Sequence, residues 1–264
     1  TTREAIGWLQ SNLDAERLFL FIHYIDPHSP YEPPQRFKKA FSGAPYYGEV
    51  AFVDRQIGRL LEFLKTHELL DGTLLVVTSD HGEGLGDHGA STHGVFLYDE
   101  IIRVPLILSG AGVPKGKTIV ETVGLIDVTP TLLDLAGLKP DPSLPGHVLT
   151  KEFPAGRSMV STSYLPSLTF GWSPIWSLYG NGEKFILSPE KEYYETKTDP
   201  GELENLVILQ SERAQFLEEK LRSSAATYIA GMHESQELGI ESAGLAQLAA
   251  LGYVAPTKLP TAIQ

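Results

Sequence analysis

The pattern of apolar and polar residues predicts strands and a long helix in turn. Two near-continuous apolar runs, at residues 18–25 and 73–79, fit strands that are buried on both faces of a sheet. Between them, apolar residues from 49 to 70 recur every three or four positions, which predicts a long helix. A strand, a crossover helix and a second strand place the two strands parallel in one sheet.

Further elements of the same kind extend this prediction over residues 1–155. An apolar stripe over residues 2–13 predicts a short helix with Thr2 as its cap, and residues 104–109 predict a third strand. A helix is predicted over residues 127–138, with Pro130 in its first turn. The predicted fold class is therefore α/β, with a mostly parallel sheet sandwiched by helices.

The pattern changes after about residue 155, and we predict a second subdomain over residues 156–264. Gly180-Asn181-Gly182 is typical of a hairpin turn between two strands. Two helices and a loose tail are expected at residues 203–230, 242–251 and 256–264. Short alternating segments predict a small antiparallel sheet with four strands, at residues 158–162, 175–179, 184–187 and 192–195.

Composition limits the kinds of function that the chain supports. With 42% hydrophobic and 20% charged residues, the chain has the composition of a globular protein. Its net charge of −12 argues against a nucleic-acid partner, because nucleic-acid binding needs a basic face. No uncharged apolar run approaches the roughly 18 residues of a membrane span. The absence of cysteine excludes disulfides, thiolate metal ligands and cysteine nucleophiles within these residues.

Histidines are concentrated where the predicted strands end. Six of the eight histidines lie between His23 and His93. In open parallel sheets, ligands bind beyond the carboxyl ends of the strands. His28, Asp80 and His81 follow two such ends, so we expect these three side chains to converge on one crevice.

Asp80-His81-Gly82 directly follows the strand predicted at residues 73–79. A carboxylate and an imidazole at a strand end can bind one divalent ion, and this mixture of donors favours Mn²⁺ or Zn²⁺ over Mg²⁺ or Ca²⁺. Gly82 would allow a sharp turn and leave room beside the metal. The alternative is a capped turn in which Asp80 binds backbone amides.

His28 lies in a loop that prolines hold rigid, Asp26-Pro-His28-Ser-Pro-Tyr31. A rigidly held histidine near a metal can donate a hydrogen bond to an anionic oxygen or protonate a leaving group. The alternative is an ordinary surface histidine. Asp26 is interpreted as a residue that holds the loop, rather than as a ligand.

A glycine-rich segment, residues 84–94, contributes two more histidines. His93 is the candidate for a second contact with the substrate anion. His88 either binds the anion as well or organises the loop. Arg103 is a further candidate for anion binding, although a salt bridge with Asp99 or Glu100 is the alternative role.

Several motifs resemble the sulfatases of the alkaline phosphatase superfamily, in the same order along nearly the whole chain. The resemblance includes the ending Leu248-Ala-Ala-Leu-Gly-Tyr-Val254. The other matching segments are Asp26-Pro-His-Ser-Pro-Tyr31, Thr78-Ser-Asp-His-Gly-Glu-Gly-Leu-Gly-Asp-His-Gly89, His93-Gly94, Arg103-Val-Pro105, Leu125-Ile-Asp-Val-Thr-Pro-Thr-Leu-Leu-Asp-Leu-Ala-Gly137 and Tyr194 through Asp199-Pro-Gly-Glu-Leu-Glu-Asn-Leu206.

The resemblance implies an alkaline phosphatase-like fold and a metal-dependent sulfuric ester hydrolase. By resemblance Asp80 and His81 are metal ligands for one divalent ion (Ca, Mg, Mn or Zn). His28 resembles the histidine that contacts the substrate anion, and His93 occupies a position that holds Lys or His near the sulfate. The Asp-His-Gly-Glu version is also similar to phosphonate monoester hydrolases and to phosphoethanolamine and lipoteichoic-acid transferases, so a phosphoester substrate is the alternative.

The family's nucleophile is a formylglycine made from Cys or Ser in a Cys/Ser-x-Pro-x-Arg motif, and no nucleophile of this kind is present in the chain. Residue 1 is Thr, and the chain starts about where the second half of the family begins. We therefore expect the C-terminal half of an enzyme that needs an N-terminal half, is inactive alone, and is periplasmic or extracellular by resemblance. A noncatalytic module that binds anions or glycans is the remaining alternative.

Overall fold

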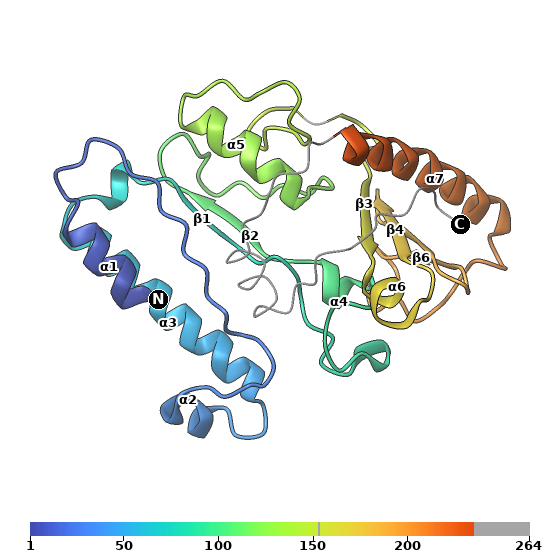
Figure 1. Ribbon diagram of the computed structural model, residues 1–264, viewed down its shortest axis with the longest axis horizontal. Helices are drawn as coiled ribbons and strands as arrows, with labels where there is room; N and C mark the ends of the chain where they lie inside the picture. The colour runs from blue at the N-terminus through green and yellow to red at the C-terminus, as the bar shows by residue number, and fades with distance from the viewer. Residues whose placement is uncertain (153, 235–264) are drawn as a thin grey trace. The chain divides into compact units, whose positions relative to one another are not determined.

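The computed structural model describes residues 1–152 and 154–234, and Figure 1 shows the arrangement of the elements. The chain forms two compact units. The first comprises residues 1–77 and 107–115, and the second comprises residues 78–106 together with the chain from residue 116 onward. The predicted subdomain division near residue 155 stays a prediction.

The first unit is built around two helices that pack against each other, α1 (Thr2–Gln10) and α3 (Pro45–Thr66). Their core contains Leu9, Leu60 and Leu64. Proline is favoured in the first turn of a helix, and α3 accordingly begins at Pro45, four residues before the predicted start. The short helix α2 (Gln35–Ala40) precedes α3, and the 3₁₀ turn η1 (Leu70–Gly72) follows it.

The prediction that Thr2 caps α1 is wrong. Thr1 stands at the N-cap position, and no side chain caps the helix there. The hydroxyl of Thr2 instead lies 2.9 Å from the hydroxyl of Tyr24. This contact ties the start of α1 to the extended segment that follows the helix.

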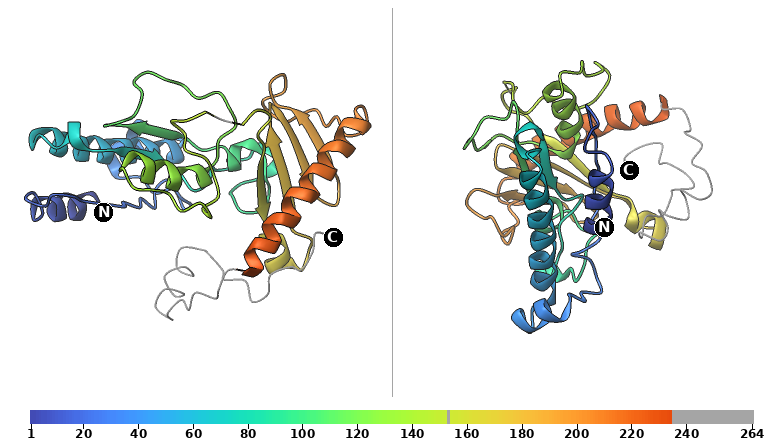
Figure 2. Two further views of the ribbon diagram at one scale, coloured as in Figure 1. Left: turned by 90° about the horizontal axis from the view of Figure 1, so that it is seen from above. Right: turned by 90° about the vertical axis from the view of Figure 1, so that its left-hand side faces the viewer.

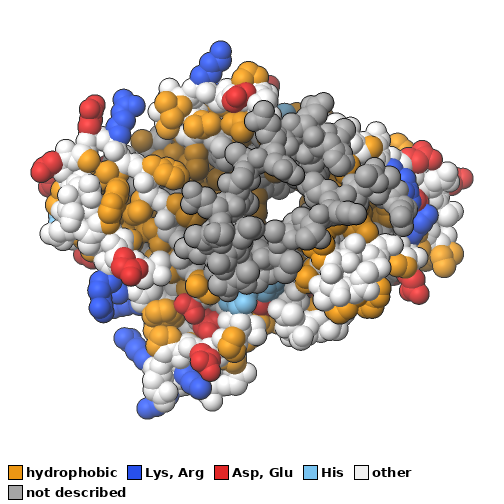
Figure 3. All heavy atoms as spheres, in the orientation of Figure 1, with side chains coloured by type: hydrophobic (Ala, Val, Ile, Leu, Met, Phe, Trp, Pro, Cys, Tyr) orange, Lys and Arg blue, Asp and Glu red, His pale blue; other side chains and the backbone are white. Residues whose placement is uncertain are grey.

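The predicted strand at residues 18–25 is also wrong for the structure described. The segment is extended, but it pairs with no strand among the residues that the structure describes. Its alternating residues Phe19, Phe21 and Ile25 are 80%, 79% and 63% exposed, whereas Ile22 packs against the core of the first unit. On the other face of the run, Leu18 and Leu20 are still 41% and 37% exposed, so the apolar run overestimated burial on both faces. Apolar side chains at the surface of α1 and α3 can be followed as orange spheres in Figure 3.

Two of the predicted strands pair with each other, which confirms their positions. They are β1 (Leu75–Thr78) and β2 (Leu106–Ser109), and they form a two-stranded sheet. Between them lie the 3₁₀ turn η2 (Asp87–Gly89) and the short helix α4 (Asp99–Ile102). The candidate residues Asp80 and His81 therefore directly follow β1, as predicted.

The predicted antiparallel sheet is confirmed in the second unit. Its strands follow one another in the order β3-β4-β5-β6, each antiparallel to the next. Asn181 and Gly182 have φ values of 58° and 81°, and they form the predicted hairpin turn between β4 and β5. The strand bounds are β3 Met159–Ser163, β4 Ile175–Gly180, β5 Glu183–Leu187 and β6 Glu192–Glu195.

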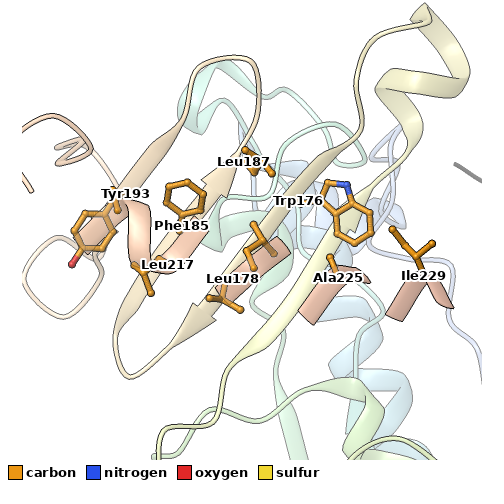
Figure 4. Close-up of a cluster of buried hydrophobic side chains, with 10 residues drawn as sticks. Trp176, Leu178, Phe185, Leu187, Tyr193, Leu217, Ala225 and Ile229 are labelled. Carbon is orange, nitrogen blue, oxygen red and sulfur yellow. The ribbon is translucent and has the colours of Figure 1, made fainter. Parts of the chain in front are cut away.

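Helix α7 (Ser211–Glu234) packs across this sheet, as the left-hand view of Figure 2 shows. Trp176 and Phe185 from the sheet meet Leu221 and Ala225 from the helix in one buried cluster, part of which Figure 4 shows. No helix in the described part of the chain is long and apolar enough to cross a membrane.

Helix α7 begins at residue 211 rather than at the predicted residue 203. The carboxylate of Asp199 accepts hydrogen bonds from the backbone N–H groups of Leu203 and Glu204, and these bonds hold a turn instead of a helix. The helix predicted at residues 242–251 and the tail at 256–264 lie outside the described residues.

The predicted helix near residue 127 is present as η3 (Leu125–Asp127) followed by α5 (Val128–Leu135). The carboxylate of Asp127 is fully buried and accepts backbone N–H bonds from Gly124 and His147 at 2.8 Å each. Arg157 contacts the same carboxylate at 2.5 Å. This ion pair joins the start of α5 to the chain that leads into β3. A further short helix, α6 (Leu165–Phe170), lies between β3 and β4.

Candidate metal and anion site

Asp80 and His81 lie directly after β1, where the strand gives way to a loop. Their side chains are 52% and 31% exposed, and Oδ1 of Asp80 is 3.8 Å from Nε2 of His81. Oδ1 of Asp80 also accepts the backbone N–H of His81 at 3.0 Å. The structure therefore contains the amide contact of a capped turn and, at the same carboxylate, an imidazole nitrogen close by.

The tautomer of His81 follows from its second ring nitrogen. Nδ1 lies 2.8 Å from the carbonyl oxygen of Gly82. A carbonyl oxygen only accepts hydrogen bonds, so Nδ1 carries the proton and the lone pair of a neutral ring is on Nε2. This is the arrangement of metal-binding histidines, in which a backbone carbonyl fixes the ring through its other nitrogen.

Glycine is required at position 82 because the backbone of α4 lies close to it. The φ angle of Gly82 lies outside the left-handed region, so the backbone conformation alone does not require glycine here. Its N–H donates to the carbonyl of Ile101 at 2.7 Å, and a Cβ at this position would lie 2.1 Å from the carbonyl oxygen of Glu100. Only glycine fits against α4 here.

His93 lies beside the proposed ligand His81. The two imidazole rings stack, with centroids 3.8 Å apart and planes 25° from parallel. Nδ1 of His93 is 3.3 Å from Oε1 of Glu83, whose side chain is only 4% exposed. Glu83 was not a candidate from the sequence. Its place two residues after His81 in the Asp-His-Gly-Glu motif was the signal that identifies it.

His28 lies in the first unit, and a buried carboxylate holds its loop. The backbone N–H groups of His28 and Glu32 donate to the two carboxylate oxygens of Glu49, at 3.1 and 2.6 Å. Nδ1 of His28 is 2.7 Å from the carbonyl oxygen of Ser29. Burial raises the pKa of Glu49, although its backbone hydrogen bonds oppose that shift. Glu49 is 1% exposed on α3, and sequence reasoning missed it.

The two remaining candidates have contacts within the protein. His88 contacts Glu100 and the carbonyl of Glu202 through its ring nitrogens. Arg103 is 78% exposed, and its Nη1 is 3.8 Å from a carboxylate oxygen of Asp99, the salt bridge that the sequence offered as its alternative role. The convergence of His28 with Asp80 and His81 stays a prediction.

Asp80 and His81 fit a divalent ion as two of its ligands. Donor atoms 3.8 Å apart can both reach one ion at the roughly 2.1 Å typical of Zn–N and Zn–O bonds. No group of three potential ligands gathers within residues 1–152 and 154–234.

Comparison with known proteins identifies the family. The sulfatase family model matches residues 1–138, so the chain belongs to the sulfatase family. An arylsulfatase of Clostridium perfringens is 28% identical over 252 residues, which cover 77% of this chain and 52% of the relative. The uncharacterized sulfatase YidJ of Escherichia coli is also 28% identical, over 78% of this chain and 50% of its own length. The chain thus spans about half the length of these relatives.

Solved structures confirm the predicted fold class. A Bacteroides fragilis protein, yidJ, assigned as a sulfatase, superposes with a TM-score of 0.72 at 22% identity, covering 84% of this chain and 57% of that protein. The phosphonate monoester hydrolase of Agrobacterium radiobacter superposes with a TM-score of 0.70 at 23% identity, covering 86% of this chain and 60% of the hydrolase. At these identities the likeness concerns the fold alone.

Proposed function

We propose that this chain supplies the second half of the active site of a metal-dependent sulfuric ester hydrolase. The observation that carries the proposal is the pair Asp80 and His81, whose donor atoms lie 3.8 Å apart directly after β1 in a chain of the sulfatase family. One divalent ion, Ca, Mg, Mn or Zn, is the proposed cofactor. Oxygen and nitrogen donors together favour Mn or Zn.

His28 and His93 are the proposed contacts for the sulfate group. Each has Nδ1 against a protein oxygen, the carbonyl of Ser29 for His28 and the carboxylate of Glu83 for His93. A proton on Nδ1 directs Nε2 to the substrate, where a protonated ring donates to an anionic oxygen. The carboxylate of Glu83 stabilises a positive charge on His93, which suits a residue that binds a divalent anion.

The proposed reaction is in-line displacement at sulfur. Asp80 and His81 would hold the divalent ion, which would supply polarisation of the ester anion and a lowered pKa for the nucleophile's hydroxyl. No nucleophile is proposed within this chain; a formylglycine from an N-terminal half is expected to attack. His28 and His93 stabilise negative charge on the transferred group, and one of them, or a residue outside the chain, protonates the leaving oxygen.

The need for a complementary half is supported by the extended segment at residues 18–25. Phe19, Phe21 and Ile25 expose three large apolar side chains along one face of a segment that pairs with no strand in the part of the chain that the structure describes. Exposed apolar strands of this kind pair readily with other strands. A strand from the complementary half is the proposed occupant, and it would turn the segment into the strand that the sequence predicts.

A phosphoester or phosphonate hydrolase, or a transferase of the phosphoethanolamine or lipoteichoic type, is the second candidate. Its support is the fold that the chain shares with the phosphonate monoester hydrolase of Agrobacterium radiobacter. A noncatalytic module that binds anions or glycans is the third candidate. It would need to bind its ligand without metal, using side chains such as His28, His93 and Arg103.

One experiment separates these candidates. The complete gene product that contains this chain is supplied with Mn²⁺, and its kcat/KM is measured on 4-nitrophenyl sulfate, 4-nitrophenyl phosphate and phenylphosphonate monoesters. The proposal predicts the highest kcat/KM on the sulfate ester and a loss of at least about 10²-fold in Asp80→Ala. Asp54→Ala, which removes an exposed carboxylate from α3, is the matched control and should change nothing. A preference for phosphorus esters, or full activity in Asp80→Ala, contradicts the proposal.

A further inference from the structure

His88 connects the glycine-rich segment, residues 84–94, to two other parts of the second unit. Nδ1 of His88 is 2.8 Å from Oε1 of Glu100 in α4, and Nε2 is 3.1 Å from the carbonyl oxygen of Glu202. The imidazole also stacks on the ring of Tyr98, with centroids 3.8 Å apart and planes 10° from parallel. A single side chain thus joins the segment to α4 and to the turn that precedes α7.

The hydrogen-bond partners of His88 define its protonation state. A carboxylate and a backbone carbonyl only accept hydrogen bonds, whereas a neutral imidazole has one donor nitrogen. Both contacts are satisfied together when both ring nitrogens carry protons. Burial alone lowers the pKa of His88, but the hydrogen bonds to Glu202 and Glu100 and the two carboxylate charges outweigh burial and raise that pKa above its usual value.

A positive charge on His88 also completes a balanced set of ion pairs. Lys184 is fully buried, and its Nζ lies 2.9 Å from Oδ1 of Asp99 and, as an ion-pair contact, 2.7 Å from Oε1 of Glu202. Asp99 also faces Arg103. Three cationic side chains, His88, Lys184 and Arg103, therefore accompany three carboxylates, of Glu100, Glu202 and Asp99.

A fourth carboxylate adjoins this set on the other side of Tyr98. Glu192 accepts hydrogen bonds from the hydroxyls of Tyr98 and Tyr194 at 2.8 and 2.6 Å. Burial and this carboxylate raise the pKa of Tyr98, so the phenol stays neutral and a donor. Loss of the proton from His88 would therefore leave an excess of negative charge on both sides of the stacked rings.

The segment that His88 holds is tightly wound and leads directly to His93. His88 has φ 49° and ψ 23°, and Gly86 and Gly89 on either side have φ values of 107° and 74°. The N–H of Gly86 donates to the carbonyl of Ala90 at 2.7 Å. The left-handed conformation is less favourable for a residue with a side chain, and the contacts of the His88 ring stabilise it together with the backbone hydrogen bonds of this turn.

We propose that His88 is a positioning residue: as an imidazolium it fastens residues 84–94 to α4 and to the turn at Glu202, and so holds His93 in place for the substrate anion. The claim that His93 is held for the substrate anion rests on the proposed function, whereas the claim that His88 fastens the segment does not. A neutral His88 loses one of its two hydrogen bonds. The segment should therefore loosen as the pH rises through the pKa of His88.

The fastening is tested by NMR titration and amide hydrogen exchange of the complete gene product. His88 is expected to titrate above the usual value of about 6.5. His88→Phe keeps a ring for stacking on Tyr98 but has no donors, and it should reduce the protection of amides in residues 85–94 at least tenfold below the pKa of His88. His67→Phe is the control, because the ring of His67 contacts that of Phe63 in the first unit, and it should leave these amides unchanged. A His88 that titrates at or below its usual value, or unchanged protection in His88→Phe, overturns the proposal.

The positioning role is tested by the pH dependence of kcat/KM on a sulfate ester. His88→Phe should lower kcat/KM at least tenfold with the metal content unchanged. Glu100→Gln removes one of the carboxylate charges that favour the imidazolium, so the loss of activity at high pH should begin at lower pH. An unchanged profile in Glu100→Gln contradicts the positioning role, even where His88→Phe is inactive. Should the wild-type protein hydrolyse no sulfate ester, the proposed function fails, and titration and exchange still decide whether His88 fastens the segment.

Discussion

The imidazole rings of His81 and His93 stack with their centroids 3.8 Å apart. His81 is the proposed metal ligand, and His93 is the proposed contact for the substrate anion. Because the rings are stacked, the position of the proposed metal ligand His81 depends on the position of the proposed anion contact His93. Each ring is also fixed through Nδ1, by the carbonyl of Gly82 and the carboxylate of Glu83 respectively.

His93→Ala should lower kcat/KM on a sulfate ester by about 10²–10³-fold, because it removes one donor from the developing charge. His93→Lys keeps a cationic donor and should retain more activity than His93→Ala. Glu83→Gln should cost about 10- to 100-fold, because it leaves His93 in place but removes the carboxylate that orients it. The assay is steady-state hydrolysis by the complete gene product. Equal activities of His93→Ala and the wild type would exclude His93 from the site.

Gly82→Ala should destabilise the protein by at least about 2 kcal/mol, because overpacking forces the backbone to shift. The new Cβ would lie 2.1 Å from the carbonyl oxygen of Glu100. Gly58→Ala is the matched control, since Gly58 lies inside α3 with open space around it, and it should stabilise the protein by about 0.5–1 kcal/mol. Denaturant unfolding measures both. A neutral Gly82→Ala would mean that the loop at Gly82 does not approach the backbone of α4 as described.

Arg157→Met should destabilise the protein by about 3–5 kcal/mol, because it leaves the buried carboxylate of Asp127 without its partner. The exposed pair Lys151 and Asp134 provides the control: Lys151→Met should cost less than about 1 kcal/mol. Chemical denaturation at pH 7 compares the two. Similar losses of stability in Arg157→Met and Lys151→Met would contradict the view that the first ion pair is buried and the second exposed.

The ion pair of Asp127 and Arg157 should make the free energy of unfolding depend on pH in the acid range. Burial alone raises the pKa of Asp127, but the bonds from Arg157, Gly124 and His147 outweigh it and lower that pKa. A carboxyl group with a lowered pKa in the folded state contributes stability that is fully present above about pH 4 and is lost as the pH falls through the folded value. Asp127→Asn should remove this part of the acid sensitivity. An unchanged acid profile in Asp127→Asn would exclude Asp127 as its source.

Glu49→Ala should raise KM and lower kcat for the sulfate ester, because it removes both acceptors that hold the loop of His28. Glu49→Gln keeps one acceptor oxygen, so its loss should be smaller. The order wild type, Gln, Ala in kcat/KM is the expected result. A reversed order would mean that the carboxylate does not position the loop.

The sequence predicted correctly the antiparallel sheet, whose strands pair with strands that are close to them in the sequence. The Gly-Asn-Gly turn and the alternating strands around it form their own sheet, and the glycine and asparagine adopt the positive φ angles that such a turn needs. The prediction of a buried strand at residues 18–25 was wrong because an apolar run indicates burial but does not show which part of the molecule buries it. The predicted helix is absent over residues 203–210 because the side chain of Asp199 accepts hydrogen bonds from backbone amides at its predicted start.

Motifs in the sequence singled out Asp80, His81, His93 and His28 as candidates, and the roles of these residues stay predictions. The carboxylates that orient them were missed, because an isolated glutamate on a helix or in a loop resembles ordinary surface charge. Glu49 becomes distinct only when the fold shows that it is buried, whereas the place of Glu83 in the Asp-His-Gly-Glu motif could have identified it.

The central claim, that Asp80 and His81 bind a divalent metal, is tested most directly by metal content. The complete gene product is purified, loaded with Mn²⁺ or Zn²⁺, dialysed and analysed by plasma mass spectrometry beside Asp80→Ala, His81→Ala and the control Asp54→Ala. The account predicts about one metal ion per wild-type and control molecule, and at least about a tenfold loss of affinity in the two ligand variants. Equal metal content and affinity in all four proteins would contradict it.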